Sequence, residues 1–216
     1  MESKLTPLQV AVLGAFFRHE KRFFLTGGAA LAGFHLGHRE TRDLDLFVAS
    51  EDDGVLEEGE SALQRAAADL GGSVEDVRTA IDFRRRLVRS AGKTVVVDLV
   101  RDRVPQLAPK SARGDVLLDS PREILANKLC TLVSRSELRD LVDVRALEST
   151  GLSIEAALRD ASMKDAGISP AVLSWILSSV EISDDAKLPG GVAPGALREW
   201  IGGLRESLAK IAWPGT

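Results

Sequence analysis

The sequence is poor in the features that mark secreted and membrane proteins. Cys130 is the only cysteine among 216 residues, so no intrachain disulfide can form and a reducing setting fits. The N-terminal residues lack a signal-peptide core. No apolar run approaches the roughly 20 residues that a membrane-spanning helix needs. We therefore expect a cytoplasmic protein that does not contact a membrane.

An excess of basic charge is also absent. Lys and Arg number 28 against 32 Asp and Glu, which gives a net charge of −4. Composition therefore provides no global signal for nucleic-acid binding, although a local basic patch remains compatible with it. The clearest local run, Arg84–Arg86, is either a solvated strand face or a contact for an RNA backbone. Hydrophobic residues make up 44% of the chain, enough for a full core.

The strongest local pattern lies in the stretch 23–48. A short apolar run ends at Thr26 and is followed by two residues without side chains, Gly27 and Gly28. The Ala/Leu-rich segment 29–36 has good helix formers, so we expect a helix there. After a polar loop, carboxylates alternate with apolar residues over 43–48, which predicts a strand.

Two carboxylates of this strand, Asp43 and Asp45, are predicted to share one face, because residues two apart on a strand point the same way. A fold tolerates such a pair when a cation sits between them, and Mg²⁺ prefers oxygen ligands. Gly27 and Gly28 let the backbone approach a phosphate at the start of the next helix. Together these features indicate nucleoside triphosphate chemistry. The plainer alternatives are an exposed polar strand and an ordinary tight turn.

A third carboxylate, Asp98, interrupts the β-branched run 94–100. Residues 90–93 read as the hairpin turn before this run. A lone carboxylate inside a buried strand is costly unless it is paired or binds something. If this strand lies beside the strand of Asp43 and Asp45, Asp98 completes a three-carboxylate site. Otherwise Asp98 is simply an exposed strand residue.

The sequence divides into a mixed part and a helical part. Residues 1–110 combine helix and strand signals, and residues 111–216 read as helices, with the boundary in a proline-containing connector. Residues 120–123, Ser-Pro-Arg-Glu, are a strong helix start. We expect an α+β protein: a mixed sheet flanked by helices, followed by a helical C-terminal region.

The order of these motifs resembles the nucleotidyltransferase fold of the polymerase-β type. Fourteen residues separate Gly28 from Asp43, slightly more than is usual for that fold. More narrowly, residues 5–150 resemble the AbiEii/AbiGii toxin group of type IV toxin–antitoxin systems. The segments that carry this resemblance are Arg39-Glu-Thr41-Arg-Asp43-Leu-Asp45-Leu, then Pro121-Arg-Glu-Ile-Leu-Ala-Asn-Lys128-Leu, then Arg135 with Arg139-Asp140-Leu-Val-Asp143-Val.

The resemblance implies transfer of a nucleoside monophosphate from an NTP to an acceptor hydroxyl, with release of pyrophosphate. The acceptor implied is RNA, specifically the 3′ end of tRNA, and a cognate antitoxin protein is an implied partner. Alternatives are transfer to a small molecule such as an antibiotic, or a non-catalytic relative that binds a nucleotide or a partner protein.

On this resemblance, the first group of site residues binds metal and phosphate. Asp43 and Asp45 would hold Mg²⁺ on the triphosphate, and Asp98 would join them at a second ion near the acceptor hydroxyl or help to remove its proton. Gly27 and Gly28 would contact phosphates through their N–H groups. Thr26 would add a hydroxyl.

The second group of site residues lies in the helical part. Lys128 and Arg135, seven residues apart, would share a helix face and neutralise the triphosphate. Asp140 and Asp143 would share another face and orient the lysine, bind the base or act as a general base. The alternatives are solvated helix faces with surface salt bridges.

Overall fold

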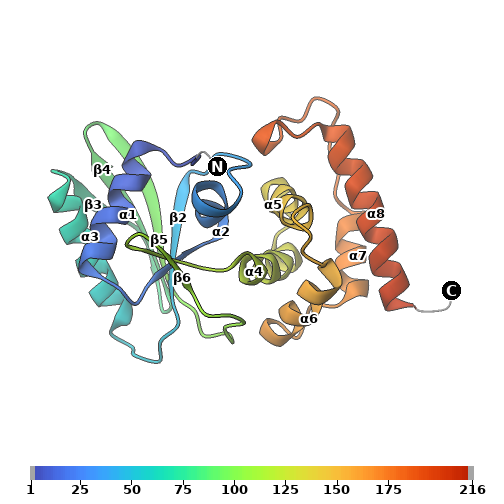
Figure 1. Ribbon diagram of the computed structural model, residues 1–216, viewed down its shortest axis with the longest axis horizontal. Helices are drawn as coiled ribbons and strands as arrows, with labels where there is room; N and C mark the ends of the chain where they lie inside the picture. Colours follow the sequence, from blue (N-terminus) through green and yellow to red (C-terminus); the bar gives the residue numbers. More distant parts are fainter. Residues whose placement is uncertain (1–2, 214–216) are drawn as a thin grey trace. The chain divides into compact units, whose positions relative to one another are not determined.

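The structure is a computed structural model that describes residues 3–213, and it divides into two compact units, Met1–Ser120 and Pro121–Thr216. The first unit combines a sheet with helices, and the second is helical (Figure 1). The expected α+β class is therefore confirmed, and so is the helical character of the C-terminal region.

A seven-stranded mixed sheet forms the centre of the first unit. Its spatial order is β3-β4-β5-β2-β1-β7-β6. The strands are β1 Phe24–Thr26, β2 Asp43–Val48, β3 Ser73–Ala80, β4 Phe83–Ser90, β5 Lys93–Arg101, β6 Ser111–Arg113 and β7 Val116–Leu118. The pairs β2–β5 and β1–β7 are parallel, and the other neighbours are antiparallel. The predicted hairpin turn joins β4 to β5.

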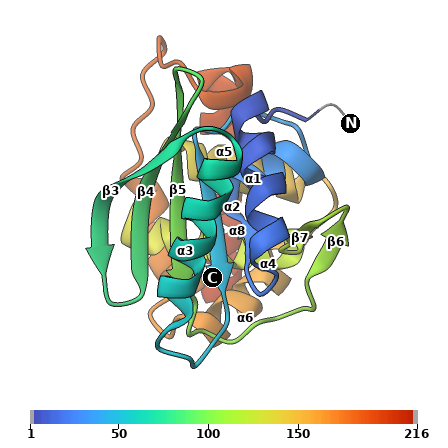
Figure 2. The ribbon, with the colours of Figure 1, turned by 90° about the vertical axis from the view of Figure 1, so that its left-hand side faces the viewer.

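Helices α1 (Pro7–His19) and α3 (Val55–Asp69) cover one face of this sheet (Figure 2). The N-terminus of α1 carries a capping box, in which the Thr6 hydroxyl accepts from the backbone N–H of Gln9 and the Gln9 side chain accepts from that of Thr6. Under α1, Phe16 packs edge-on against Phe17 and Phe23, with ring centroids 5.5 and 5.6 Å apart. Such pairs add about 0.5–1.5 kcal/mol each beyond the apolar area they bury.

The helix expected at residues 29–36 begins earlier and changes its winding. The α-helical part, α2, spans Gly27–Ala30, and a π-helical segment follows over Leu31–His35. The wider winding is visible in the backbone bond from the N–H of Leu36 to the carbonyl of Leu31, 2.8 Å long. The helix therefore starts at the glycine pair itself, directly after β1.

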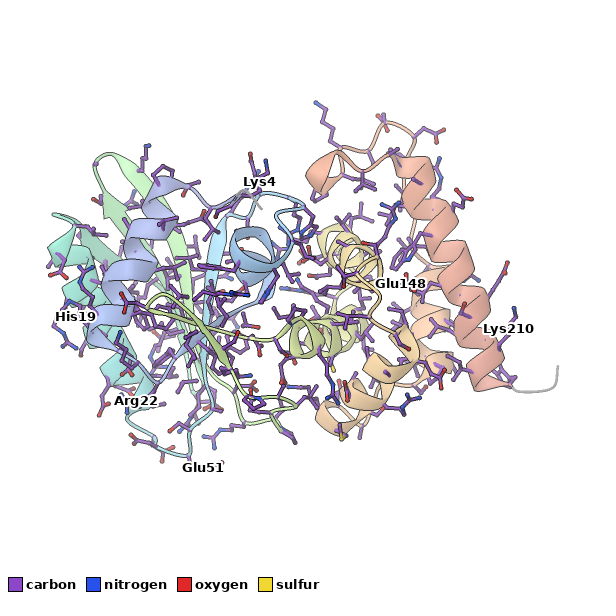
Figure 3. The ribbon with its side chains drawn as sticks, viewed as in Figure 1. Lys4, His19, Arg22, Glu51, Glu148 and Lys210 are labelled. Carbon is purple, nitrogen blue, oxygen red and sulfur yellow. The ribbon has the colours of Figure 1, made fainter. Side chains whose placement is uncertain are left out.

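The second unit consists of helices α4 Pro121–Ser134, α5 Leu138–Glu148, α6 Ile154–Lys164, α7 Pro170–Ser178 and α8 Pro194–Ala212, with a short 3₁₀ turn at Pro189–Gly191. Serine hydroxyls cap α6 and α7. Glu148, labelled in Figure 3, accepts a hydrogen bond of 2.5 Å from the indole N–H of Trp200 and so ties α5 to α8. Within residues 3–213, no helix is long and apolar enough to cross a bilayer.

The boundary between the units lies between Ser120 and Pro121, ten residues beyond the expected division at 110/111. The difference arises because Ser111–Arg113 and Val116–Leu118 form a hairpin. Its second strand pairs with β1 through Leu25 and Leu118, so it belongs to the sheet. The first helix after the hairpin starts at Pro121, as the sequence predicts.

Candidate active site

The glycine pair lies at the end of β1, packed against charged side chains. Gly27 has φ +61°, a conformation that favours glycine. A Cβ atom on Gly27 would lie 2.4 Å from a carboxylate oxygen of Asp45. A Cβ on Gly28 would lie 2.7 Å from Nη2 of Arg39. The position of Gly27 therefore favours glycine through both its backbone conformation and its contact with Asp45, whereas a side chain on Gly28 would have to displace the end of the Arg39 side chain.

The acidic strand β2 has the two faces that its sequence predicts. Leu44 and Leu46 are fully buried, whereas Asp43 and Asp45 are partly exposed on the other face. The hydroxyl of Thr41 donates to Asp43 Oδ1 at 3.1 Å. The carboxylates thus emerge together from one side of the sheet, and Asp45 lies over the glycine turn.

The strand of Asp98 is the direct neighbour of β2. Asp98 is the register partner of Asp45 in the parallel β2–β5 pair, and Thr26 is the partner of Asp45 in the antiparallel β1–β2 pair. Register partners point to the same face of a sheet. Thr26, Asp45 and Asp98 therefore form a row across three strands, with Asp43 two residues along β2. The strand of Asp98 therefore lies beside the strand of Asp43 and Asp45, as a three-carboxylate site requires.

An arginine that the sequence analysis did not assign to the site extends this row. Arg85 on β4 is the register partner of Asp98, and it donates from Nε and Nη2 to the two carboxylate oxygens at 2.8 and 2.7 Å. The pKa of Arg85 is raised, chiefly by this hydrogen bond and further by the charges of Asp98, Asp43 and Asp45, against the lowering effect of partial burial. The guanidinium therefore lies within the field of all three carboxylates.

The two neighbouring arginines have different partners. Arg84 donates to Glu57 on α3 at 2.5 Å, and Arg86, fully buried, donates from Nε to Glu60 at 2.7 Å. Successive residues of a strand point to opposite faces, so Arg84 and Arg86 face α3 while Arg85 faces the carboxylates. The run 84–86 is thus not a continuous solvated patch, since each guanidinium is paired with an acidic side chain.

A buried carboxylate beside the turn was also missed from the sequence. Asp119 accepts from the Thr26 hydroxyl and from Lys110 Nζ, both at 2.7 Å. Its backbone carbonyl accepts from His35 Nε2 at 2.8 Å. Asp119 therefore fixes the orientation of Thr26 and anchors the π-helical segment after the glycine pair.

The second unit brings together the four residues that the sequence singles out there. Lys128 Nζ lies 2.6 Å from Asp140 Oδ1 and 2.8 Å from Asp143 Oδ2, and both carboxylates are fully buried. Helix α4 ends at Ser134, so Arg135 lies just outside it, yet its Nε lies 3.5 Å from Asp140 Oδ2. Two cations and two carboxylates thus meet in one cluster.

The charge state of Lys128 follows from this cluster. Burial by itself would lower the pKa of Lys128, but the charges of Asp143 and Asp140, with their hydrogen bonds, outweigh burial and raise the pKa. A protonated lysine can donate and neutralise, but it cannot take a proton. Asp140 and Asp143 therefore hold Lys128 charged and fix its direction.

The residues of the first unit fit a hard divalent cation in part. Asp43 and Asp45 provide carboxylate oxygens on one face beside the glycine turn, the donor type that Mg²⁺ prefers. Both oxygens of Asp98 accept hydrogen bonds from Arg85. Within residues 3–213, no group of three or more His, Cys, Asp or Glu side chains is arranged to hold a metal ion. The donor set fits at two carboxylates, and the third carries an arginine.

The side chains of His35 and Cys130, which could in principle act in chemistry, are partly buried and bonded to backbone carbonyls. His35 is half-buried and bonded to the Asp119 carbonyl, and burial lowers its pKa. The thiol of Cys130 lies 3.6 Å from the carbonyl of Ala161, and burial raises its pKa. Neither residue belongs to the carboxylate face described above.

Comparison with known proteins gives one family model and several solved structures. The family model "Nucleotidyl transferase AbiEii toxin, Type IV TA system" matches residues 12–188. Among solved structures, MenT4, a nucleotidyltransferase toxin of Mycobacterium tuberculosis H37Rv, is 19% identical with a TM-score of 0.66, over 95% of this chain and 82% of that one. A putative nucleotidyltransferase of Helicobacter pylori is 18% identical with a TM-score of 0.56, over 94% of both chains. No curated protein matches the chain.

Proposed function

Because the chain belongs to the AbiEii family of nucleotidyltransferase toxins of type IV toxin–antitoxin systems, we propose that it transfers a nucleoside monophosphate from an NTP to a hydroxyl of RNA, at the 3′ end of tRNA. The bond from the α-phosphorus to the acceptor oxygen forms, the bond to the β-phosphate bridging oxygen breaks, and pyrophosphate leaves. The observation that carries this proposal is the row Thr26, Asp45 and Asp98, with Asp43 beside it and the glycine turn at its end.

In this proposal, Asp43 and Asp45 would hold Mg²⁺ on the triphosphate, and Asp98 would join them for a second ion once Arg85 no longer occupies its oxygens. When bound, such ions neutralise the phosphates and stabilise the attacking and leaving oxygens of an in-line displacement. The N–H groups of Gly27 and Gly28 bind phosphate oxygens at the start of α2. The position of the glycine pair supports this role, since a Cβ on Gly27 would collide with Asp45.

The hydroxyl of Thr26, next to the glycine pair, is held in one orientation by its hydrogen bond to Asp119. Because the hydroxyl donates its one hydrogen bond to Asp119, its oxygen can only accept from any further partner. Thr26 would therefore receive a hydrogen bond or a cation rather than donate to a phosphate oxygen. Asp119 acts through Thr26 and is a positioning residue.

In the second unit, Lys128 and Arg135 form a cationic pair suited to phosphate oxygens, and Asp140 and Asp143 orient Lys128. Of the three roles that the sequence left open for the two aspartates, orientation of the lysine has direct support, because each carboxylate accepts from Nζ. A planar guanidinium and a compact ammonium together suit a chain of phosphates.

The test is an incubation of the protein with each of the four α-³²P-labelled NTPs and fractionated cell RNA. We expect one NTP or a subset to label the tRNA fraction in the presence of Mg²⁺, and Asp45→Asn to abolish the label. Asp115→Asn, the same change at an exposed turn, is the control and should label normally. Full labelling by Asp45→Asn would contradict the metal assignment.

The acceptor and the antitoxin are tested separately. An NTP-dependent gain in the mass of a drug, without label on RNA, would show that the acceptor is a small molecule and not RNA. Expression should arrest growth, and coexpression of a neighbouring antitoxin gene should relieve the arrest. An inactive chain that still binds Mg²⁺–NTP would instead be a nucleotide-binding relative.

A further inference from the structure

Arg85 forms a two-bond contact with the third carboxylate of the proposed site. Its Nε and Nη2 each reach one oxygen of Asp98, at 2.8 and 2.7 Å. This parallel geometry is the strongest that an arginine and a carboxylate form. Both oxygens of Asp98 are thereby turned toward a guanidinium, in the plane where they would otherwise bind a cation.

The two partners differ in how far each is exposed. The side chain of Asp98 is 7% exposed, and that of Arg85 is 42% exposed. Asp98 is fixed on the interior strand β5, whereas Arg85 reaches it from β4 through a long, flexible side chain. The guanidinium can therefore swing away into water without opening the core, while the carboxylate stays in place.

The charges around Arg85 show what holds it. Three carboxylates, Asp43, Asp45 and Asp98, share its face of the sheet. Like charges this close repel, and Arg85 offsets part of that repulsion. A divalent cation between the same carboxylates would offset more of it, so the cation and the guanidinium compete for one position.

We propose that Arg85 is the built-in counter-ion of the three-carboxylate face and competes with a divalent cation for Asp98. The inference rests on the proposed function, since it takes Asp43 and Asp45 as the primary cation ligands. Arg85 occupies Asp98 until a cation displaces it, and so it sets the cation affinity of the site. Arg85 is a positioning residue, because it acts through Asp98.

The three arginines divide between the two faces of the sheet. Arg84 and Arg86 are directed to Glu57 and Glu60 on α3, where they join the sheet to that helix. Because successive strand residues point to opposite faces, Arg85 lies on the carboxylate face, where it pairs with Asp98 on the adjacent strand.

The test measures Mn²⁺ binding to the full chain without nucleotide. Binding is monitored as the loss of the free Mn²⁺ signal in electron paramagnetic resonance. Arg85→Met should bind Mn²⁺ about tenfold more tightly than the wild type, because one positive charge leaves and Asp98 becomes available. Arg89→Met removes the same charge from the same strand, where Arg89 pairs with the exposed Glu75, and should change the affinity little. Arg85→Met combined with Asp98→Asn should lose the gain.

An Arg85→Met protein that binds Mn²⁺ within about twofold of the wild type would overturn the inference. So would a double variant that keeps the tighter binding, because the gain would then not pass through Asp98. If Arg85→Met does not fold, as judged by circular dichroism, Arg85→Lys is used instead, since lysine cannot make the two parallel bonds. Tighter binding by that variant supports the competition, and unchanged or weaker binding refutes it.

Failure of the proposed function looks different. In that case Asp45→Asn would bind Mn²⁺ as well as the wild type, whatever Arg85→Met does. Loss of binding in Asp45→Asn together with unchanged affinity in Arg85→Met would leave the proposed function standing and remove only the role of Arg85.

Discussion

Asp45 on β2 and Asp98 on β5 are register partners in adjacent parallel strands. Their carboxylates therefore leave the same face of the sheet side by side, an arrangement that costs free energy unless positive charge lies between them. Arg85 supplies part of that charge. A divalent cation at the same face would add to it.

Gly27→Ala should abolish NMP transfer and lower the free energy of unfolding by about 1–2 kcal/mol. The stability loss comes from a left-handed backbone with a Cβ atom, and the loss of transfer comes from displacement of Asp45, whose carboxylate lies 2.4 Å from that Cβ. Urea denaturation and labelled-NTP transfer measure the two effects.

The control for this change is Gly92→Ala in the β4–β5 turn. Gly92 also has positive φ, +71°, but nothing lies within 4 Å of its Cβ position. This variant should lose similar stability and keep its transfer activity. Equal transfer by the two variants would show that the collision with Asp45 has no consequence.

Lys128→Met should destabilise the protein by about 3–5 kcal/mol, because Asp140 and Asp143 would be left buried without the lysine charge. Adding Asp140→Asn and Asp143→Asn to it should restore part of that stability but no transfer activity. The urea midpoint of each variant gives the result. A loss below about 1 kcal/mol in Lys128→Met would mean that the cluster does not depend on its lysine.

Stability should fall as pH drops below about 6.5, the ordinary pKa of histidine. Burial lowers the pKa of His35 in the folded chain, so the unfolded chain takes up a proton first. The contribution of His35 is complete above the unfolded pKa and is lost as pH falls through the folded one. Urea titrations from pH 8 to 5 should show this slope, and His35→Gln should flatten it. An unchanged slope in that variant would assign the effect elsewhere.

The faces of the strands could be predicted from the sequence. The alternation of Asp43 and Asp45 with Leu44 and Leu46 fixes which residues are buried, because a strand has a period of two. A single aspartate in an otherwise β-branched run identified Asp98 as a residue needing a partner. These are local rules, and the sheet obeys them.

The partners across the sheet could not be predicted. Strand alternation separates Arg85 from Arg84 and Arg86, but only the position of α3 decides which face meets Glu57 and Glu60 and which meets Asp98. Similarly, Asp119 lies 93 residues from Thr26 in the chain, and no local signal reports their hydrogen bond. The division at Ser120 was missed because strands of three residues give a weak pattern.

The central claim is that a divalent cation on a triphosphate binds between Asp43 and Asp45 beside Gly27 and Gly28. The most direct test is the anomalous difference map of crystals grown with Mn²⁺ and a non-hydrolysable NTP. We predict a peak within bonding distance of Asp43 and Asp45, with phosphate oxygens at the N–H groups of the glycine pair. A peak elsewhere, or a triphosphate bound away from that turn, would contradict the account.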